Sequence, residues 1–146
     1  MDKKIRTLVS ILNHRGIKTT GSCEGHVDHG APAPWVKVTS SAAGTKYVLR
    51  AMSRYLDAFY ANRIVPNDVR LVVRKARSGF WIHNGGDAYD RWRAFVNESV
   101  ERIRRGEKIR SYIDARERSR RSKRLPAYQE EARGFAKFLK KRHFEN

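Results

Sequence analysis

The side chains best suited to chemistry gather in one short stretch of the 146-residue chain, GSCEGHVDHG, which spans residues 21–30. Cys23, His26 and His29 stand in C-x2-H-x2-H spacing, so a single loop can bring a thiolate and two imidazoles to one metal ion. Cysteine and histidine ligands suit zinc, although a structural zinc site normally takes four ligands and this loop offers three. The spacing therefore indicates zinc as one use of the loop among several.

The same loop also suits nucleophilic catalysis. A cysteine that follows a strand, between two glycines, can lie with its sulfur exposed on a tight turn. His26 or His29 could then activate the Cys23 thiol, and the Glu24 or Asp28 carboxylate could orient the imidazole. The stretch lacks the downstream arginine of a cysteine-based phosphatase, and it matches neither a G-x-S-x-G elbow nor a P-loop.

Two uses without bond-making chemistry are also open. Glycines and small residues over 19–25 let successive backbone N–H groups point inward and bind an anion. Alternatively, the stretch is a polar turn in which Cys23 is buried as a small apolar residue, as most cysteines are. Residues 21–30 can thus be a metal site, a catalytic loop, an anion site or a structural turn.

One resemblance rests on this stretch. The sequence TTGSCEGH, Thr19 to His26, followed by PWVKV, resembles the TTSSCSGR strand and loop near the start of the wybutosine-synthesis tRNA methyltransferase family. It is also similar to a GSCEGH motif in small uncharacterised bacterial and phage proteins. This chain has Glu24 where the family has Ser and His26 where the family has Arg, and the family's later cofactor motif has no counterpart here. The resemblance implies an α/β fold that uses S-adenosylmethionine, with Ser22, Cys23 and Gly25 lining a site that faces RNA.

Charge is the strongest signal in the composition. Thirty-two Lys and Arg against fifteen Asp and Glu give a net charge of +17, which attracts polyanions. Residues 1–100 hold 16 basic and 8 acidic residues, whereas residues 101–146 hold 16 and 7, so the excess is concentrated toward the C-terminus. Between positions 102 and 124, eleven cations, nine of them Arg, face three carboxylates, so internal ion pairs cannot neutralise this segment.

This surplus predicts a protein that binds nucleic acid. Arginine meets phosphate oxygens with a planar, bidentate fork, and clustered cations release the counterions of a polynucleotide. A second basic cluster consists of Lys46, Arg50 and Arg54, which follow each other at intervals of four residues along a predicted helix. The predicted contact residues are Lys46, Arg50, Arg54, Arg102, Arg105, Arg116, Arg118, Arg120, Arg121, Lys123 and Arg124.

RNA is favoured over duplex DNA as the partner. The chain has no zinc-finger spacing, basic zipper or helix-turn-helix signature. The Arg/Ser-rich segment 116–124 has no apolar residue, so nothing in it is expected to contribute to a core, and such arms commonly fold only on binding RNA. Tyr60, Trp35, Phe80 and Trp81 could stack on bases, although Phe80 and Trp81 are expected to divide between core and surface.

Two alternatives remain beside this interpretation. The protein could be an enzyme that modifies nucleic acid through the loop around Cys23, or it could bind an acidic surface of a partner protein. The composition favours a binding protein over an enzyme. A lone cysteine, no signal-peptide pattern and no apolar run of about 20 residues predict a cytoplasmic protein without a membrane partner.

Periodicity predicts the elements that position these residues. Helices are expected at 3–15, 43–63, 87–105 and from Pro126 onward, with strands at 17–23, 34–38, 69–77 and 80–84. This order predicts an α+β fold in which helices cover one face of a sheet of about four strands. Residues 1–105 then form the core domain and residues 106–146 a basic helical extension. The apolar stripe at Phe135, Phe138 and Leu139 predicts that the last helix packs back on the core.

Overall fold

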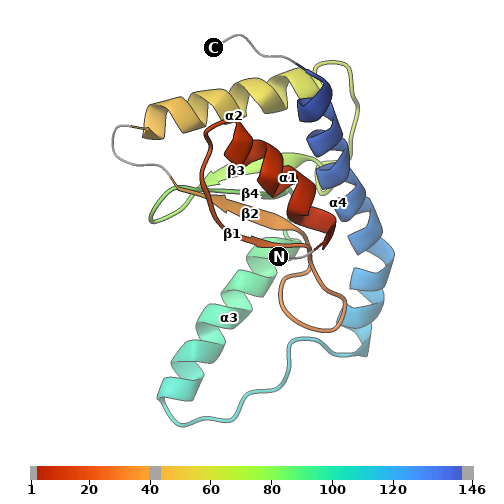
Figure 1. Cartoon of the computed structure of the whole chain (residues 1–146). Helices are drawn as coiled ribbons and strands as arrows, with labels where there is room; N and C mark the ends of the chain where they lie inside the picture. The colour runs from red at the N-terminus through yellow and green to blue at the C-terminus, as the bar shows by residue number, and fades with distance from the viewer. Residues whose placement is uncertain (1–2, 40–43, 143–146) are drawn as a thin grey trace.

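The computed structural model describes residues 3–39 and 44–142 and confirms the predicted α+β class. Figure 1 shows its four helices and four strands. In chain order they are α1 (Lys3–His14), β1 (Thr19–Cys23), β2 (Trp35–Val38), α2 (Thr45–Tyr60), β3 (Leu71–Lys75), β4 (Phe80–Asn84), α3 (Ala88–Arg104) and α4 (Ala115–Lys141). The part of the predicted second helix that falls on residue 43 lies outside the described residues.

The four strands form one antiparallel sheet in the order β1-β2-β4-β3. In the register, Val36 of β2 lies opposite Ile82 of β4, and Ile82 lies opposite Val73 of β3. Because directly opposed residues share a face, these apolar side chains cover one side of the sheet. We call this side the core face. It packs against α1, α2 and the C-terminal half of α4.

Helix α1 shows how the sequence pattern sets this packing. Ile5, Leu8 and Leu12 recur at helical spacing and are buried in the core. Gly16 follows with a φ of +80°, a conformation that terminates helices and that favours glycine. The chain then turns back, and the Ile17 N–H donates to the Leu12 carbonyl at 2.9 Å. The helix predicted from periodicity is confirmed here.

Helix α4 differs from the prediction, because it is one continuous helix of 27 residues rather than a flexible arm followed by a helix. It begins at the N-cap Asp114, whose carboxylate accepts from the Glu117 N–H at 2.8 Å. Pro126 lies inside it, although proline usually breaks a helix interior. Buried contacts on both sides of the proline, at Arg121, Leu125 and Tyr128, hold the two halves in line.

The C-terminal half of α4 packs back on the sheet layer, as the apolar stripe predicted. Phe135 and Leu139 are fully buried and belong to the same core cluster as α1 and α2. Residues 132–139 therefore share the core of residues 1–105 rather than forming a separate one. Segment 116–124 adds no side chain to this apolar core, as expected, although its Glu117 and Arg121 are buried.

Helix α3 leaves this layered arrangement and projects away from the sheet (Figure 1). It starts after Gly86, whose φ of +81° turns the chain out of β4. The apolar stripe predicted along it is covered over the first half of the helix, up to Phe95, on which Tyr112 of the returning segment stacks with ring centroids 4.9 Å apart. Farther along, Val100 and Ile103 are 43% and 58% exposed. Asp87 occupies the predicted N-cap position, but its side chain makes no capping hydrogen bond.

Within residues 3–39 and 44–142, no helix is both long enough and apolar enough to cross a membrane.

Candidate nucleic-acid interface

Three backbone carbonyls of the loop between β1 and β2 bind the Arg121 side chain of α4. The Arg121 Nη1 donates to the carbonyls of His26, His29 and Gly30 at 3.0, 3.3 and 2.8 Å. Its Nε donates to Glu117 Oε1 at 3.1 Å, one helical turn away. Arg121 is 2% exposed. The Glu117 carboxylate therefore neutralises this buried guanidinium, and three backbone carbonyls accept hydrogen bonds from it.

Glycine is required where the loop meets α4. Gly25 has a φ of +82°, and a Cβ there would lie 2.7 Å from Leu125 Cδ1 and 2.9 Å from the Ala33 carbonyl carbon. A side chain would therefore push the loop off the helix. The Gln129 Nε2 adds a hydrogen bond to the Glu24 carbonyl at 3.0 Å. Structural docking of α4 is thus one use of the loop that contains the reactive residues.

The structure does not assemble the metal site suggested by Cys23, His26 and His29. The two imidazole rings stack on each other with centroids 4.0 Å apart. His29 Nδ1 lies 2.7 Å from an Asp28 carboxylate oxygen, and this hydrogen bond lowers the pKa of Asp28. Across the two described ranges, no three His, Cys, Asp or Glu side chains converge in a group that could hold a metal ion.

The three residues proposed for catalysis make contacts with structural roles. The Cys23 sulfur accepts from the Gly25 N–H at 3.3 Å, inside the turn. The Glu24 carboxylate accepts from the Lys4 backbone N–H at 3.1 Å, at the N-terminus of α1. The imidazole of His26 stacks on His29. The carboxylate is thus turned toward α1 and the imidazole toward the loop tip.

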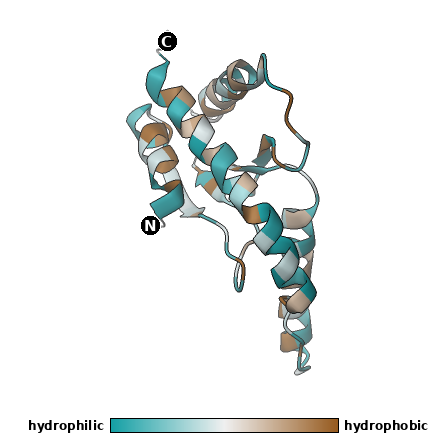
Figure 2. Cartoon of the chain, turned by 90° about the vertical axis from the view of Figure 1, so that its right-hand side faces the viewer, coloured by the Kyte–Doolittle hydropathy of each residue, from teal (hydrophilic) through white to brown (hydrophobic). Residues whose placement is uncertain are grey.

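The first half of α4 carries the six predicted cations of segment 116–124, and it is mostly hydrophilic in Figure 2. Apart from Arg121, its basic side chains are exposed. Arg120 donates to Glu117 Oε2 at 3.2 Å, and Arg124 pairs with Asp68. The remaining three have no carboxylate within ion-pair distance in the described part of the chain. They are Arg116, Arg118 and Lys123.

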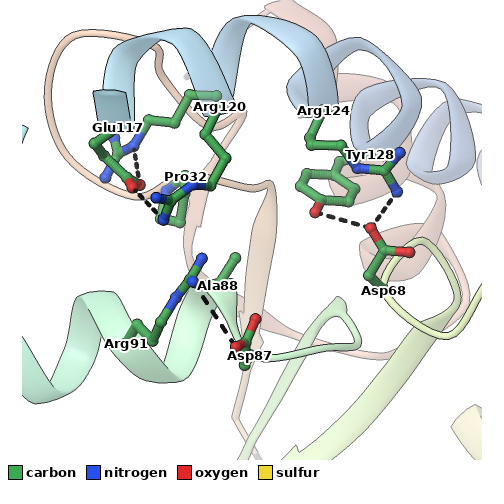
Figure 3. A pocket seen from close by; sticks show the side chains of 10 residues that line it. Pro32, Asp68, Asp87, Ala88, Arg91, Glu117, Arg120, Arg124 and Tyr128 are labelled. Carbon is green, nitrogen blue, oxygen red and sulfur yellow. Dashed lines mark hydrogen bonds and ion pairs between the residues drawn. The ribbon is translucent and has the colours of Figure 1, made fainter. Parts of the chain in front are cut away.

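A cavity of about 300 Å³ lies between the start of α3 and this half of α4 (Figure 3). Figure 3 shows Arg91 of α3 and Arg120 of α4 pointing toward one another across it. We call it the arginine cavity. Its lining residues are Pro32, Asp68, Asp87, Ala88, Arg91, Glu117, Arg120, Arg121, Arg124 and Tyr128.

Two cations of the arginine cavity, Arg91 and Arg124, pair with carboxylates that keep some exposure to solvent. Arg91 lies 3.8 Å from Asp87, which is 79% exposed. On the other side, partial burial acts to raise the pKa of Asp68, but hydrogen bonds from Arg124 and from the Tyr128 hydroxyl outweigh it, so the pKa is lowered. The N-terminus of α3 adds the partial positive charge of its free N–H groups. The cavity can therefore accept a phosphate group.

The predicted contact residues do not form one surface. Lys46, Arg50 and Arg54 are exposed on α2, which lies at the other end of the molecule from the first half of α4 (Figure 1). Arg102 and Arg105 lie at the far end of α3 and both approach Glu107, at 4.0 and 3.0 Å. The six basic residues of segment 116–124 are brought together, with Arg121 turned inward.

Sequence reasoning missed Arg91, which faces the cluster on α4 from another helix. Its only signal is its place one turn after the α3 N-cap, and that pattern says nothing about a neighbour 29 positions later.

Comparison of the chain with protein-family models, with curated proteins and with solved structures gives no match.

Proposed function

We propose that the protein binds nucleic acid, with RNA favoured over duplex DNA, through the arginine cavity and the exposed cations beside it. One observation supports this most: among the residues that the structure describes, the six cations of segment 116–124 have only two carboxylates as ion-pair partners, Glu117 and Asp68. The surplus cations are ordered on one rigid helix, so they form a fixed positive surface. A polyanion is the ligand that such a surface binds best.

The geometry suits a phosphate backbone. Arg116, Arg120 and Lys123 follow each other at i, i+4 and i+7, so they lie along one side of α4. Arg91 faces this side from α3, and Arg124 continues it by one turn. Arg91 and Arg124 are 42% and 44% exposed in their ion pairs with Asp87 and Asp68, and exposed pairs contribute only about 0–1 kcal/mol. An incoming phosphate can therefore replace or share these carboxylates at little cost.

The preference for RNA rests on the sequence. The spacings typical of zinc fingers, basic zippers and helix-turn-helix proteins are missing from the chain. The loop resemblance, which implies a site facing RNA, points the same way.

Salt dependence of binding tests the proposal. If about five phosphates of a single strand are neutralised, log K should fall with log salt at a slope of about −3.5, so binding at 200 mM salt should be about a hundredfold weaker than at 50 mM. The triple variant Arg116→Ser, Arg120→Ser, Lys123→Ser should reduce this slope by about 2. Its melting temperature should stay close to that of the wild type, because Arg120 is exposed and Glu117 keeps Arg121 as its partner.

The matched control removes three cations from α2 instead, with Lys46→Ser, Arg50→Ser and Arg54→Ser. We expect this variant to keep the salt slope of the wild type. Loss of slope in the α2 variant alone would move the interface to α2. No binding to RNA or DNA at 50 mM salt, or binding that salt does not weaken, would contradict the proposed function.

A further inference from the structure

The sheet has a second face, opposite the core face, that is lined by aromatic and basic side chains. In the register, Trp81 of β4 lies directly opposite Lys37 of β2 and Arg74 of β3, and Trp35 lies opposite His83. Because side chains alternate along a strand, these residues point away from Val36 and Ile82 of the core face. Trp35, Lys37 and Trp81 are partly exposed. We call this side the tryptophan face.

The rings on this face are held in fixed positions. Trp35 and Trp81 meet edge to face with centroids 4.8 Å apart, and Trp81 lies 6.3 Å from Tyr89. Gly21 of β1 leaves room for the Trp35 ring, since a Cβ there would lie 3.3 Å from Cζ3. His83 stacks on Tyr89 at 4.5 Å, and burial lowers its pKa. The rings therefore form a rigid and uncharged floor.

Cations surround this floor. The Lys37 ammonium lies 5.2 Å above the Trp81 ring, and Arg74 pairs with Asp90 while remaining 45% exposed. A second copy of this chain is a poor partner, because it would bring another net charge of +17 against the first. An apolar protein surface would leave the ammonium and guanidinium groups poorly solvated. The ligand that fits has flat apolar surfaces and negative charges close together.

We infer that the tryptophan face binds unpaired nucleotides, with bases stacked on the Trp35–Trp81 pair and flanking phosphates on Lys37 and Arg74. The inference rests on the proposed function, since the arginine cavity would hold the neighbouring backbone. Base stacking on aromatic side chains needs an open base face, which a duplex does not offer. The ligand is therefore single-stranded at this face.

The two surfaces meet at the start of α3. Tyr89 packs on the tryptophan face, and Arg91, two residues later, lines the arginine cavity. Asp90, between them, pairs with Arg74 of the sheet. One strand of nucleic acid can therefore pass from the rings to the arginines around the first turn of α3.

The test compares two probes of equal charge at 50 mM salt: an eight-nucleotide oligouridine and an eight-unit abasic ribose-phosphate chain. We expect the wild type to bind oligouridine about tenfold more tightly, because one stacked base contributes a factor of this order. Trp81→Leu should remove this preference and leave the affinity for the abasic chain unchanged. Tryptophan fluorescence should be quenched by oligouridine and not by the abasic chain.

A second variant tests the inference independently, in case Trp81→Leu does not fold. Lys37→Gln keeps all the rings and should weaken both probes alike, lowering the salt slope by about 0.7. Its matched control is Lys75→Gln, which removes an exposed cation beside Phe80 on the core side of the same sheet and should leave both affinities unchanged.

Equal wild-type affinity for the two probes would overturn the inference and leave the proposed backbone binding intact. So would a Trp81→Leu protein that stays folded and keeps its preference for oligouridine, or a Lys37→Gln variant that behaves like Lys75→Gln. If neither probe nor any duplex binds, the proposed function fails and this inference fails with it.

Discussion

Replacing Arg121 by Met tests whether a buried guanidinium fixes α4 to the loop between β1 and β2. Methionine keeps an unbranched apolar stem but is shorter and has no charge or donor. The change removes the hydrogen bonds to three loop carbonyls and the ion pair with Glu117, whose side chain is 6% exposed. Removing one partner of a buried pair costs about 3–5 kcal/mol, because the other charge stays buried. Since Arg120 also contacts this carboxylate, we expect the lower end, about 3 kcal/mol.

Urea unfolding followed by circular dichroism measures this loss. For a slope of about 2 kcal/mol per M, the midpoint should fall by about 1.5 M. Arg120→Met is the matched control, because it removes the other partner of Glu117 from an exposed position and should cost less than about 1 kcal/mol. The double variant Arg121→Met, Glu117→Met should recover much of the loss, since apolar pairs replace buried ion pairs well. Equal losses for Arg121→Met and Arg120→Met would refute the reasoning.

Two further predictions concern the fold that holds the interface. Gly25→Ala should lower stability by about 2–4 kcal/mol, because it adds a steric overlap with Leu125 to the strain of a positive φ. The control is Gly16→Ala, where φ is also positive but no atom lies within 4 Å of the new Cβ, and it should cost only about 1 kcal/mol. Equal melting temperatures of the two variants would contradict the close contact at Gly25. Burial lowers the pKa of His83 below its ordinary 6.5, so as pH falls through 6.5 the unfolded chain gains a proton before the folded one does. Stability should therefore drop between pH 7.5 and 5.5, and His83→Gln should remove that part of the drop; an unchanged drop in this variant would assign it to another group.

The element order could be predicted because it depends on local patterns. The apolar spacing of α1 and the short apolar runs of β3 and β4 appear within windows of a few residues, and the structure confirms these three elements. The continuity of α4 could not be predicted in this way. It depends on Arg121 meeting carbonyls more than 90 positions earlier, and no local pattern contains that contact. The exposed half of the α3 stripe was missed for the same reason, since apolar spacing shows a face and not what covers it.

The candidate interface could be located from sequence only at the level of charge. Arg120 and Arg121 are neighbours of the same type, yet one is 45% exposed and the other 2%. A step of about 100° around the helix separates them, and the position of the loop decides which one is buried. Composition counts both as free cations. Composition also does not single out Arg91 and Lys37, whose roles depend on neighbours on other elements, the α4 arginines and Trp81.

The two features that stand apart in the sequence, the loop GSCEGHVDHG and the arginine-rich segment, are one unit in the structure. The loop takes Arg121 out of the basic surface and uses it to clamp α4. This clamp sets the rotation of the helix, so that Arg116, Arg120 and Lys123 lie on a side that is not turned into the loop. A charge that sequence reasoning assigned to the ligand is therefore used to orient the others, and a rigid basic surface loses less conformational entropy on binding a phosphate backbone than a disordered arm would.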